Sequence, residues 1–364
     1  MRVLYDNEIF LIQKYGGATR YFYELIKRMP ALKTEVLLYM GKFINEYGLE
    51  EYANRFTVFS GKRIKHIPRT KLISIKLQKP FFERFAGKQN FDLLHQTYYA
   101  DINVKKKFKR IITIHDFTHE KLSGNFSSLD KTAELKKLSV EKSDGIICVS
   151  ESTKNDLMER YDTKGKKVKV IYHGNSLKYD VTEEPVIKDK YLLYVGDRRS
   201  YKNFGVVVKL FGMNENLRND YKLVCCGGGK FTKDEQEQMT KSGVVNNFEQ
   251  IESRDNNIAN LYFYAKAFIY PSKYEGFGIP MIEAMYNGCP IVASNVSSLP
   301  EVGDTAALYF NPDSAEELNE KINIILENGD FVKRLKSLGK EREKMFSWDK
   351  CASETHKFYE EVLG

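Results

Sequence analysis

The stretch YPSKYEGFGIPMIEAMYNGCPIVAS, residues 270–294, reads as a strand end, a glycine loop, a helix and a second strand. The loop contains Gly276 and Gly278, and the predicted helix closes at Gly288, a residue typical of helix carboxyl ends. Pro280 suits the first helical turn, where its missing N–H costs nothing. A strand followed by a glycine loop and a helix amino end predicts a site for an anion, phosphate above all.

Two carboxylates flank this loop, Glu275 just before it and Glu283 in the first turn of the predicted helix. Since like charges repel, neither is expected to touch a phosphate, but both can accept hydrogen bonds from sugar hydroxyls. The pattern therefore favours a nucleotide-sugar, with a ribose at one carboxylate and the transferred sugar at the other. The alternative is that Glu283 only stabilises the amino end of the helix, by about 0.3–1 kcal/mol.

On both sides of residues 270–294, short β-type runs alternate with longer helical stretches along the chain. This pattern is typical of parallel sheets with crossover helices. Several strands are apolar on consecutive residues, as expected where both sheet faces are covered. Strands are predicted at 2–6, 35–40, 56–60, 91–95, 110–115, 144–150 and 167–172, then at 191–196, 222–227, 248–251, 267–271 and 290–294. Helices are predicted near 18–30, 70–87, 130–142 and 151–161, then at 202–212, 233–242, 256–265, 279–288, 314–328 and 331–344.

A chain of 364 residues suits two domains, since domains usually have about 100–200 residues. The polar linker at 179–190 marks the break between a first domain at 1–178 and a second at 185–345. We predict an α/β protein of two doubly wound, Rossmann-like domains that face each other across a ligand-binding cleft. The periodicity of a last helix, at about 349–364, does not say where it packs, and we expect it to return to the first domain.

The formal net charge of +8 is unevenly distributed. Residues 1–180 contain 34 Lys and Arg against 21 Asp and Glu, a net of +13, so residues 181–364 contain 23 against 28, a net of −5. The excess is densest from Arg55 to Lys88, where ten basic residues stand against one acid, Glu83, and the segment 60–89 combines this charge with Leu, Ile and Phe side chains. This composition predicts a basic amphipathic helix on an anionic membrane, each cation contributing roughly 1 kcal/mol. The alternative is an ordinary solvated helix on its own sheet, interrupted by Pro80; no nucleic-acid-binding motif accompanies the charge, so no nucleic-acid partner is expected.

The five cysteines form no C-x-x-C pair, and most lie in apolar runs, which favours a reduced, cytosolic setting. We expect neither a signal peptide nor a membrane-spanning segment, because the amino terminus enters a strand directly and no run of 18 apolar residues occurs.

The stretch that begins with Glu275 resembles the E-x7-E motif of the retaining family 4 glycosyltransferases, which have the GT-B fold of two facing Rossmann-like domains. YVGDRRSYKNF (194–204), VCCGGG (224–229) and ASNVSSLPEVGDTAALYFNP (293–312) resemble further blocks of that family's second domain. VIYHGNS (170–176) resembles its interdomain junction, and KYGGATRYFYEL (14–25) and IHDFTHE (114–120) resemble loops of its first domain. The resemblance covers nearly the whole chain and is weak only at about 40–90 and 315–345.

The resemblance implies roles for individual residues. Glu275 would hold hydroxyls of the donor sugar, and Glu283 would bind the nucleotide ribose. The loop residues Gly276, Phe277 and Gly278 would face the diphosphate, with backbone N–H groups offered by the last two.

Lys202 matches the lysine that neutralises the departing diphosphate. The family has an Arg just before that lysine, where this chain has Tyr201. We therefore expect Arg198 to take the arginine role, with Arg199 as the alternative. Fixed cations can replace a metal ion at a leaving diphosphate.

No D-x-D motif and no Cys/His cluster with zinc spacing occurs. We therefore expect a metal-independent reaction without a cofactor, in which the nucleotide-diphosphate sugar is a co-substrate. The resemblance implies retention of anomeric configuration, with the donor's phosphate oxygen taking the acceptor proton.

In the first half, Gly16 and Gly17 follow the first strand and could approach the diphosphate from the opposite side, although a plain turn would look the same. His115 ends a strand and matches the family's histidine near the transferred sugar; alternatively, it is structural. His95, at another strand end, and Tyr98 and Tyr99 after it are candidate acceptor-site residues.

The sequence thus predicts a cytosolic glycosyltransferase, peripheral at a membrane, that moves a hexose from a nucleotide-diphosphate sugar to a glycan or lipid-linked acceptor in surface polysaccharide synthesis. By resemblance to mannosyltransferase-like members, the first candidate donor is guanosine diphosphate mannose. The alternatives are a GT-B nucleotide-sugar epimerase and a non-catalytic, membrane-associated GT-B scaffold.

Overall fold

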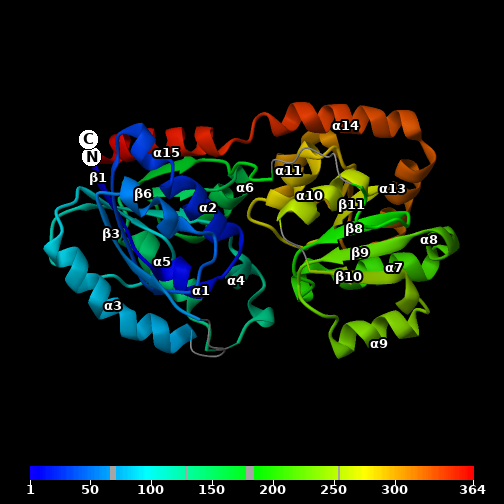
Figure 1. Ribbon diagram of the computed structural model, residues 1–364, viewed down its shortest axis with the longest axis horizontal. Coiled ribbons are helices and arrows are strands. Elements are labelled where there is room, and N and C mark those ends of the chain that lie inside the picture. Colours follow the sequence, from blue (N-terminus) through cyan, green and yellow to red (C-terminus); the bar gives the residue numbers. More distant parts are fainter. Residues whose placement is uncertain (66–70, 128, 178–183, 253–254) are drawn as a thin grey trace. The chain divides into compact units, whose positions relative to one another are not determined.

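The computed structural model describes residues 1–65, 71–127, 129–177, 184–252 and 255–364. Part of the expected linker (178–183) and part of the basic segment (66–70) lie outside these described residues. The chain divides into two compact units (Figure 1). Unit 1 comprises residues 1–173 and 348–364, and unit 2 comprises residues 174–347.

Unit 1 is built on a seven-stranded sheet in the order β3-β2-β1-β4-β5-β6-β7, and all its strand pairings are parallel. The strands are β1 (Arg2–Tyr5), β2 (Glu35–Phe43), β3 (Val58–Arg63), β4 (Leu93–Gln96), β5 (Lys109–Ile114), β6 (Gly145–Cys148) and β7 (Lys167–Val170). Its helices are α1 (Glu8–Ile12), α2 (Gly17–Ile26), α3 (Lys71–Lys88), α4 (Thr118–Lys121), α5 (Thr132–Glu141), α6 (Glu151–Arg160) and α15 (Trp348–Leu363).

Unit 2 repeats the plan with six parallel strands in the order β10-β9-β8-β11-β12-β13, the order of dinucleotide-binding folds. The strands are β8 (Tyr191–Val195), β9 (Lys222–Cys226), β10 (Phe248–Ile251), β11 (Ala267–Tyr270), β12 (Ile291–Ser294) and β13 (Ala307–Phe310). Its helices are α7 (Phe204–Met213), α8 (Glu215–Asp220), α9 (Lys233–Lys241), α10 (Asp255–Tyr264), α11 (Ile279–Tyr286), α12 (Leu299–Gly303), α13 (Ala315–Glu327) and α14 (Gly329–Glu343).

The predicted α/β class with two doubly wound parallel sheets is confirmed, and three local differences have physical reasons. The helix expected near 18–30 ends at Ile26 and gives way to a 3-10 turn at Met29–Leu32, because Pro30 cannot continue an α-helix. The four-residue strand β13 was not predicted; a run as short as ALYF carries little pattern. Pro80 does not interrupt α3; it lies on the exposed side of the helix, where water can bind the carbonyl that lacks a partner.

The core of unit 1 follows from side-chain alternation along the strands. Val3 and Tyr5 of β1 face the core shared with α2 and α15, whereas Leu4 faces the core covered by α3. Helix α15 therefore belongs to unit 1, and it brings Trp348, the single tryptophan of the chain, into that core with 3% of its surface exposed.

A buried hydrogen-bond chain fastens α15 to the sheet. The Tyr359 hydroxyl lies 3.0 Å from the hydroxyl of Tyr5 and 2.6 Å from Nδ1 of His95. On the other side of the ring, His95 Nε2 lies 2.8 Å from Oγ1 of Thr113, which in turn contacts the Tyr21 hydroxyl at 3.2 Å. Because buried polar groups are costly unless they are paired, this chain specifies how the helix docks.

Replacing Tyr359 by Phe should lower the free energy of unfolding of unit 1 by about 1–3 kcal/mol, because two buried partners lose their hydrogen bond. Urea unfolding followed by Trp348 fluorescence measures this unit specifically. Tyr15→Phe is the control: Tyr15 is 60% exposed, and its loss should cost less than about 0.5 kcal/mol. Equal stability of Tyr359→Phe and the wild type would contradict the role of this chain.

Candidate functional site

The candidate site of unit 2 lies where its strand order reverses, between β8 and β11. Parallel α/β sheets bind ligands beyond the carboxyl strand ends at such a point. The loop after β8 (196–203) and the loop after β11 (271–278) are joined there by hydrogen bonds. The N–H of Lys273 donates to the carbonyl oxygen of Tyr201 at 2.8 Å, and Asn203 Nδ2 donates to that of Pro271 at 3.1 Å.

Lys202 and Glu275, two residues predicted from the sequence, meet at this point. Lys202 Nζ lies 2.6 Å from Oε1 of Glu275, and their side chains are 19% and 12% exposed. Burial and the neighbouring Glu275 raise the pKa of Tyr270 well above its usual value, so that its hydroxyl stays protonated. Because both side chains are mostly buried, each charge needs an oppositely charged partner, either the other residue or a ligand.

Two serines fix the loop that contains Glu275. The N–H of Glu275 donates to Oγ of Ser297, and the Ser298 hydroxyl donates to the carbonyl oxygens of Glu275 and Phe277, each at 2.9 Å. Gly278 caps α11 with φ +110°, and a Cβ there would lie 3.1 Å from the Leu299 side chain. The loop with Gly276 and Phe277 is therefore held at the amino end of α11.

Glu283 lies in the second turn of α11, not in the first turn as expected, because the helix begins at Ile279. It is only 7% exposed, and the Tyr262 hydroxyl donates to its Oε2 at 3.4 Å. The effect of a helix dipole is confined to the first turn. A simple charge at the helix amino end therefore does not explain this buried carboxylate.

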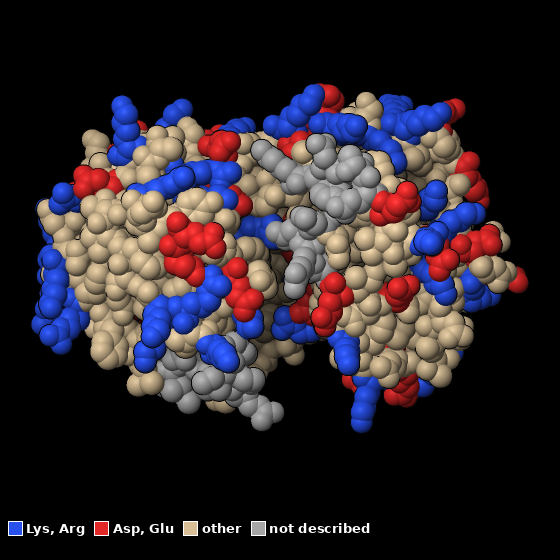
Figure 2. All heavy atoms as spheres, viewed as in Figure 1, with Lys and Arg blue, Asp and Glu red and all other residues tan. Residues whose placement is uncertain are grey.

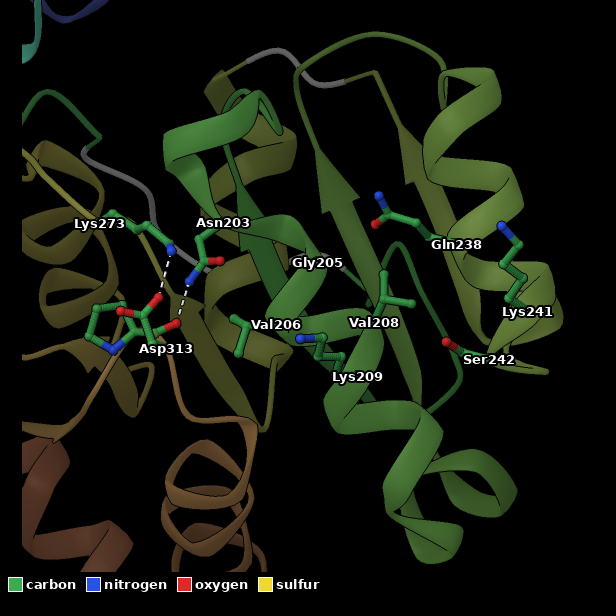
Figure 3. A pocket seen from close by; sticks show the side chains of 11 residues that line it. Asn203, Gly205, Val206, Val208, Lys209, Gln238, Lys241, Ser242, Lys273 and Asp313 are labelled. Carbon is green, nitrogen blue, oxygen red and sulfur yellow. Dashed lines mark hydrogen bonds and ion pairs between the residues drawn. The ribbon is translucent and has the colours of Figure 1, made fainter. Parts of the chain in front are cut away.

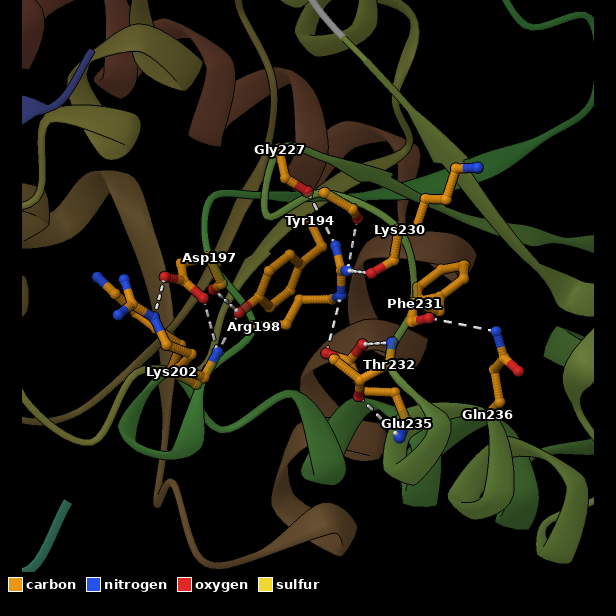
Figure 4. A network of polar contacts seen from close by, with 12 residues as sticks. Tyr194, Asp197, Arg198, Lys202, Gly227, Lys230, Phe231, Thr232, Glu235 and Gln236 are labelled. Atoms are coloured by element: carbon orange, nitrogen blue, oxygen red, sulfur yellow. Dashed lines mark hydrogen bonds and ion pairs between the residues drawn. The ribbon is translucent and has the colours of Figure 1, made fainter. Parts of the chain in front are cut away.

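Arg198 lies against the turn that follows β9 and the start of α9. Its guanidinium is 2% exposed, pairs with Glu235 at 3.0 Å and donates to backbone carbonyls of residues 227–230 (Figure 4). In this structure the guanidinium is occupied by these partners, and the diphosphate contact expected of Arg198 stays a prediction. The alternative, Arg199, is 80% exposed and pairs with Asp197.

A hollow of about 450 Å³ lies beside this region, between α7 and α9 (Figure 3). It is lined by Val206, Lys209, Gln238 and Lys241, and at its edge Lys273 pairs with Asp313 at 2.5 Å. Asn203 and Lys273 of the two site loops also line it, whereas Lys202, Glu275 and Glu283 do not.

In unit 1, Gly16 and Gly17 begin α2 directly after α1. The Gly16 N–H donates to the Tyr47 hydroxyl at 3.3 Å, and a Cβ on Gly16 would overlap the end of the Gln13 side chain. The Gln13 amide thus occupies the space beside Gly16, and a larger residue at position 16 would have to displace it.

His115 follows β5, the strand that pairs with β4. Burial lowers its pKa to about 4, with Asp116 opposing the shift and Lys136 adding to it, so the imidazole is neutral at pH 7. Its buried Nε2 has no hydrogen-bond partner among the described residues. A neutral ring with one such nitrogen can bind a hydroxyl of a ligand.

Lys136 was missed by the sequence analysis. It is fully buried, and its Nζ donates to the carbonyl oxygen of Asp116 at 2.7 Å and to Oε2 of Glu120 at 2.8 Å. The ammonium also lies 4.6 Å from the ring centre of Phe117. Lys136 thus holds the loop that begins with His115. The signal that could have revealed it is a lysine on the inward stripe of α5, between Thr132 and Val140.

The three candidate acceptor residues have different environments. The Tyr99 hydroxyl accepts the backbone N–H of His115 at 3.3 Å, and its ring packs on Tyr98 with centres 4.5 Å apart. His95 is fully buried, with Tyr359 and Thr113 on its two ring nitrogens. His95 therefore has a structural role in the core, a correction to its expected contact with an acceptor.

Within the described ranges, no three His, Cys, Asp or Glu side chains gather as a metal site requires. None of the helices described is both long and apolar enough to cross a bilayer.

Two Rossmann-like units with this switch-point site define a GT-B glycosyltransferase architecture. Models of two families match the chain: "Glycosyltransferase Family 4" at residues 15–178 and "Glycosyl transferases group 1" at residues 178–344. The chain belongs to the family 4 glycosyltransferases.

Relatives and solved structures agree with this membership. The O-antigen chain mannosyltransferase B of Escherichia coli is 25% identical, over 94% of this chain and 95% of its own. The sucrose-phosphate synthase of Thermosynechococcus elongatus has the same fold, with a TM-score of 0.79 at 20% identity over 100% and 99% of the two chains. An Anabaena protein solved with UDP-glucose gives a TM-score of 0.73 at 15% identity over 99% and 100%.

Replacing Lys136 by Met should destabilise unit 1 by about 3–5 kcal/mol, because Glu120 and Asp116 would lose a buried cation. The adjacent Lys137, whose side chain is 64% exposed, provides the control, and Lys137→Met should change stability by less than about 0.5 kcal/mol. Unfolding followed by Trp348 fluorescence compares the two variants. A similar, small effect of both would show that Lys136 does not hold the loop.

Proposed function

We propose that the protein transfers a hexose, of mannose or glucose type, from a nucleotide-diphosphate sugar to a glycan or lipid-linked acceptor, with retention of configuration. The observation that carries the proposal is the Lys202–Glu275 pair at the switch point of unit 2. Guanosine diphosphate mannose is the first candidate donor, supported by the similarity to an O-antigen chain mannosyltransferase. The product would enter a surface polysaccharide such as O-antigen, capsule or lipopolysaccharide.

The ion pair suits a donor that brings a diphosphate and a sugar together. Lys202 can turn from Glu275 to the phosphate, which releases the carboxylate to accept hydrogen bonds from sugar hydroxyls. Glu283 binds the ribose hydroxyls, and Tyr262 orients its carboxylate from the other side. Gly276, Phe277 and Gly278 direct the amino end of α11 toward the diphosphate.

In the reaction, the bond between the sugar C1 and the phosphate oxygen breaks while the acceptor oxygen bonds to C1 on the same face. The acceptor proton passes to the leaving phosphate oxygen. Lys202 stabilises the negative charge that develops there, in the place a metal ion would take. Neutral His115 donates or accepts a hydrogen bond at the transferred sugar.

Two substitutions should separate binding from catalysis. Glu283→Gln should weaken donor binding about tenfold or more in calorimetry, because a charge-assisted hydrogen bond to ribose is lost. Lys202→Met should lower kcat about 100-fold with a smaller change in donor KM, because its charge acts mainly on the leaving group. Glu320→Gln, on the exposed face of α13, is the control and should match the wild type.

The same measurements across a panel of nucleotide-sugars test the whole proposal. Transfer should continue in the presence of a chelator and should require an acceptor. Epimerisation with donor alone would support the epimerase instead, and no binding to any donor would support a scaffold. Loss of activity with chelator would contradict the metal-independent mechanism.

We also propose that the protein is cytoplasmic and binds an anionic membrane through α3. Leu77 and Phe81 lie on the exposed side of α3, 63% and 65% exposed, and Arg84 and Lys88 continue the same side. The other side is buried through Phe82. Basic side chains gather at the left edge of Figure 2, where Figure 1 shows the carboxyl end of α3. Exposed aromatic and basic residues on one helix face are typical of interfacial binding.

Phe81→Asp should reduce binding to vesicles that contain phosphatidylglycerol about tenfold or more, because an apolar contact with the membrane is replaced by a charge. Co-sedimentation measures the bound fraction. Met213→Asp, at a 48% exposed position on α7 of unit 2, is the control and should bind as the wild type does. Equal loss in both variants, or none in either, would refute binding through α3.

A further inference from the structure

Three consecutive glycines after β9 have left-handed backbone angles. Gly227, Gly228 and Gly229 have φ values of +91°, +73° and +71°. We call residues 227–230 the glycine turn. Left-handed residues normally occur singly, since a run of them forms no favourable helix. Glycine adopts these angles without a side-chain clash, so the contacts of the glycine turn decide which conformation it keeps.

The guanidinium of Arg198 supplies these contacts (Figure 4). Nη1 donates to the carbonyl oxygen of Gly227 at 2.8 Å, and Nη2 donates to those of Gly229 and Lys230 at 2.7 and 3.1 Å. Nε donates to Oε1 of Glu235, at the start of α9, at 3.0 Å. A planar, permanently charged fork suits several fixed acceptors at once. This guanidinium is therefore committed to the glycine turn and α9.

Arg198 itself belongs to the loop that carries Lys202. On one side, Arg198 ties this loop to the glycine turn. On the other side, the carbonyl of Tyr201 accepts the N–H of Lys273 at 2.8 Å. The Tyr194 hydroxyl lies within the same loop, 2.7 Å from the carbonyl oxygen of Asp197 and 3.3 Å from that of Lys202. Within this loop, Lys202 thus lies close to two residues that are held by hydrogen bonds, Arg198 and Tyr201.

We propose that Arg198 is a positioning residue: it fixes the loop that places Lys202 against the leaving diphosphate, and it does not itself touch the donor. The inference rests on the proposed function, because it assigns Lys202 to the diphosphate. A displacement of about 1 Å in a catalytic cation can cost about 100-fold in rate. The glycine turn and Arg198 together keep Lys202 from such displacement.

Arg198→Lys keeps the positive charge but loses the planar guanidinium that binds several carbonyls at once. This variant should lower kcat about tenfold or more, while donor KM changes less than about threefold. In the Lys202→Met background, Arg198→Lys should have no further effect, because its action passes through Lys202. Effects that multiply in the double variant, or a raised KM with unchanged kcat, would mean direct contact with the donor and overturn the proposal.

A matched pair of glycine variants tests the contact between Arg198 and the glycine turn without changing Arg198. A Cβ on Gly228, at φ +73°, would lie 2.9 Å from Nη1 of Arg198. Gly243 has nearly the same φ, +69°, and nothing within 4 Å of its Cβ position. Gly228→Ala should therefore reproduce the fall in kcat, and Gly243→Ala should stay within about threefold of the wild type. The same kcat in both variants would overturn the proposal that the glycine turn and Arg198 position Lys202.

Hydrogen exchange separates this inference from the proposed function, since it needs no turnover. In Arg198→Lys, amides of the glycine turn and of residues 200–203 should both exchange at least threefold faster than in the wild type. Faster exchange in the glycine turn alone would overturn the link to Lys202, whatever reaction the protein catalyses. Failure of all donors to bind would instead refute the proposed function.

Discussion

Parallel strand pairing is the constraint on which both units depend. Each parallel neighbour requires a crossover, and the helices of these crossovers cover both faces of each sheet. The strands must therefore be apolar on consecutive residues, as in β6 and β11, where all four residues are buried. Polar side chains inside the sheets, such as His95 and Thr113, are paired with one another, and unpaired chemistry is expected in the loops at the carboxyl edges. The pair of Lys202 and Glu275 lies there because β8 and β11 are neighbours.

The same constraint explains how much could be predicted. Alternating apolar runs and helices specified the class of fold, and strand ends pointed to the loops with Lys202, Glu275 and His115. The sequence pattern could not show which partner a polar side chain in or after a strand would contact. Arg198 donates hydrogen bonds to carbonyls 29 to 32 residues away in the chain, and His95 is hydrogen-bonded to Tyr359, which lies 264 residues away. Such partners are set by packing, not by local pattern.

Charge is used differently in the protein's interior and on its surface. The net excess of +13 in residues 1–180 is carried largely by exposed side chains, whereas Lys136 is fully buried there and Arg198 nearly so in unit 2. Both buried cations donate to backbone carbonyls of a loop that follows a strand, and each also pairs with a glutamate. Their carbonyl contacts hold loop conformations that no regular secondary structure would support. The net charge of a domain therefore says little about which cations shape its site.

Because α15 belongs to unit 1, the two units differ in how a gene encodes them. Unit 2 is one uninterrupted stretch, 174–347, whereas unit 1 is assembled from two stretches that flank it. A coding sequence for unit 2 can thus be excised or exchanged for that of a related unit by two cuts, at His173–Gly174 and Ser347–Trp348. Unit 1 survives such an exchange only if Trp348 and the helix it begins remain with it. Recombination between relatives is therefore expected to move unit 2 as a single segment, with both parts of unit 1 left in place.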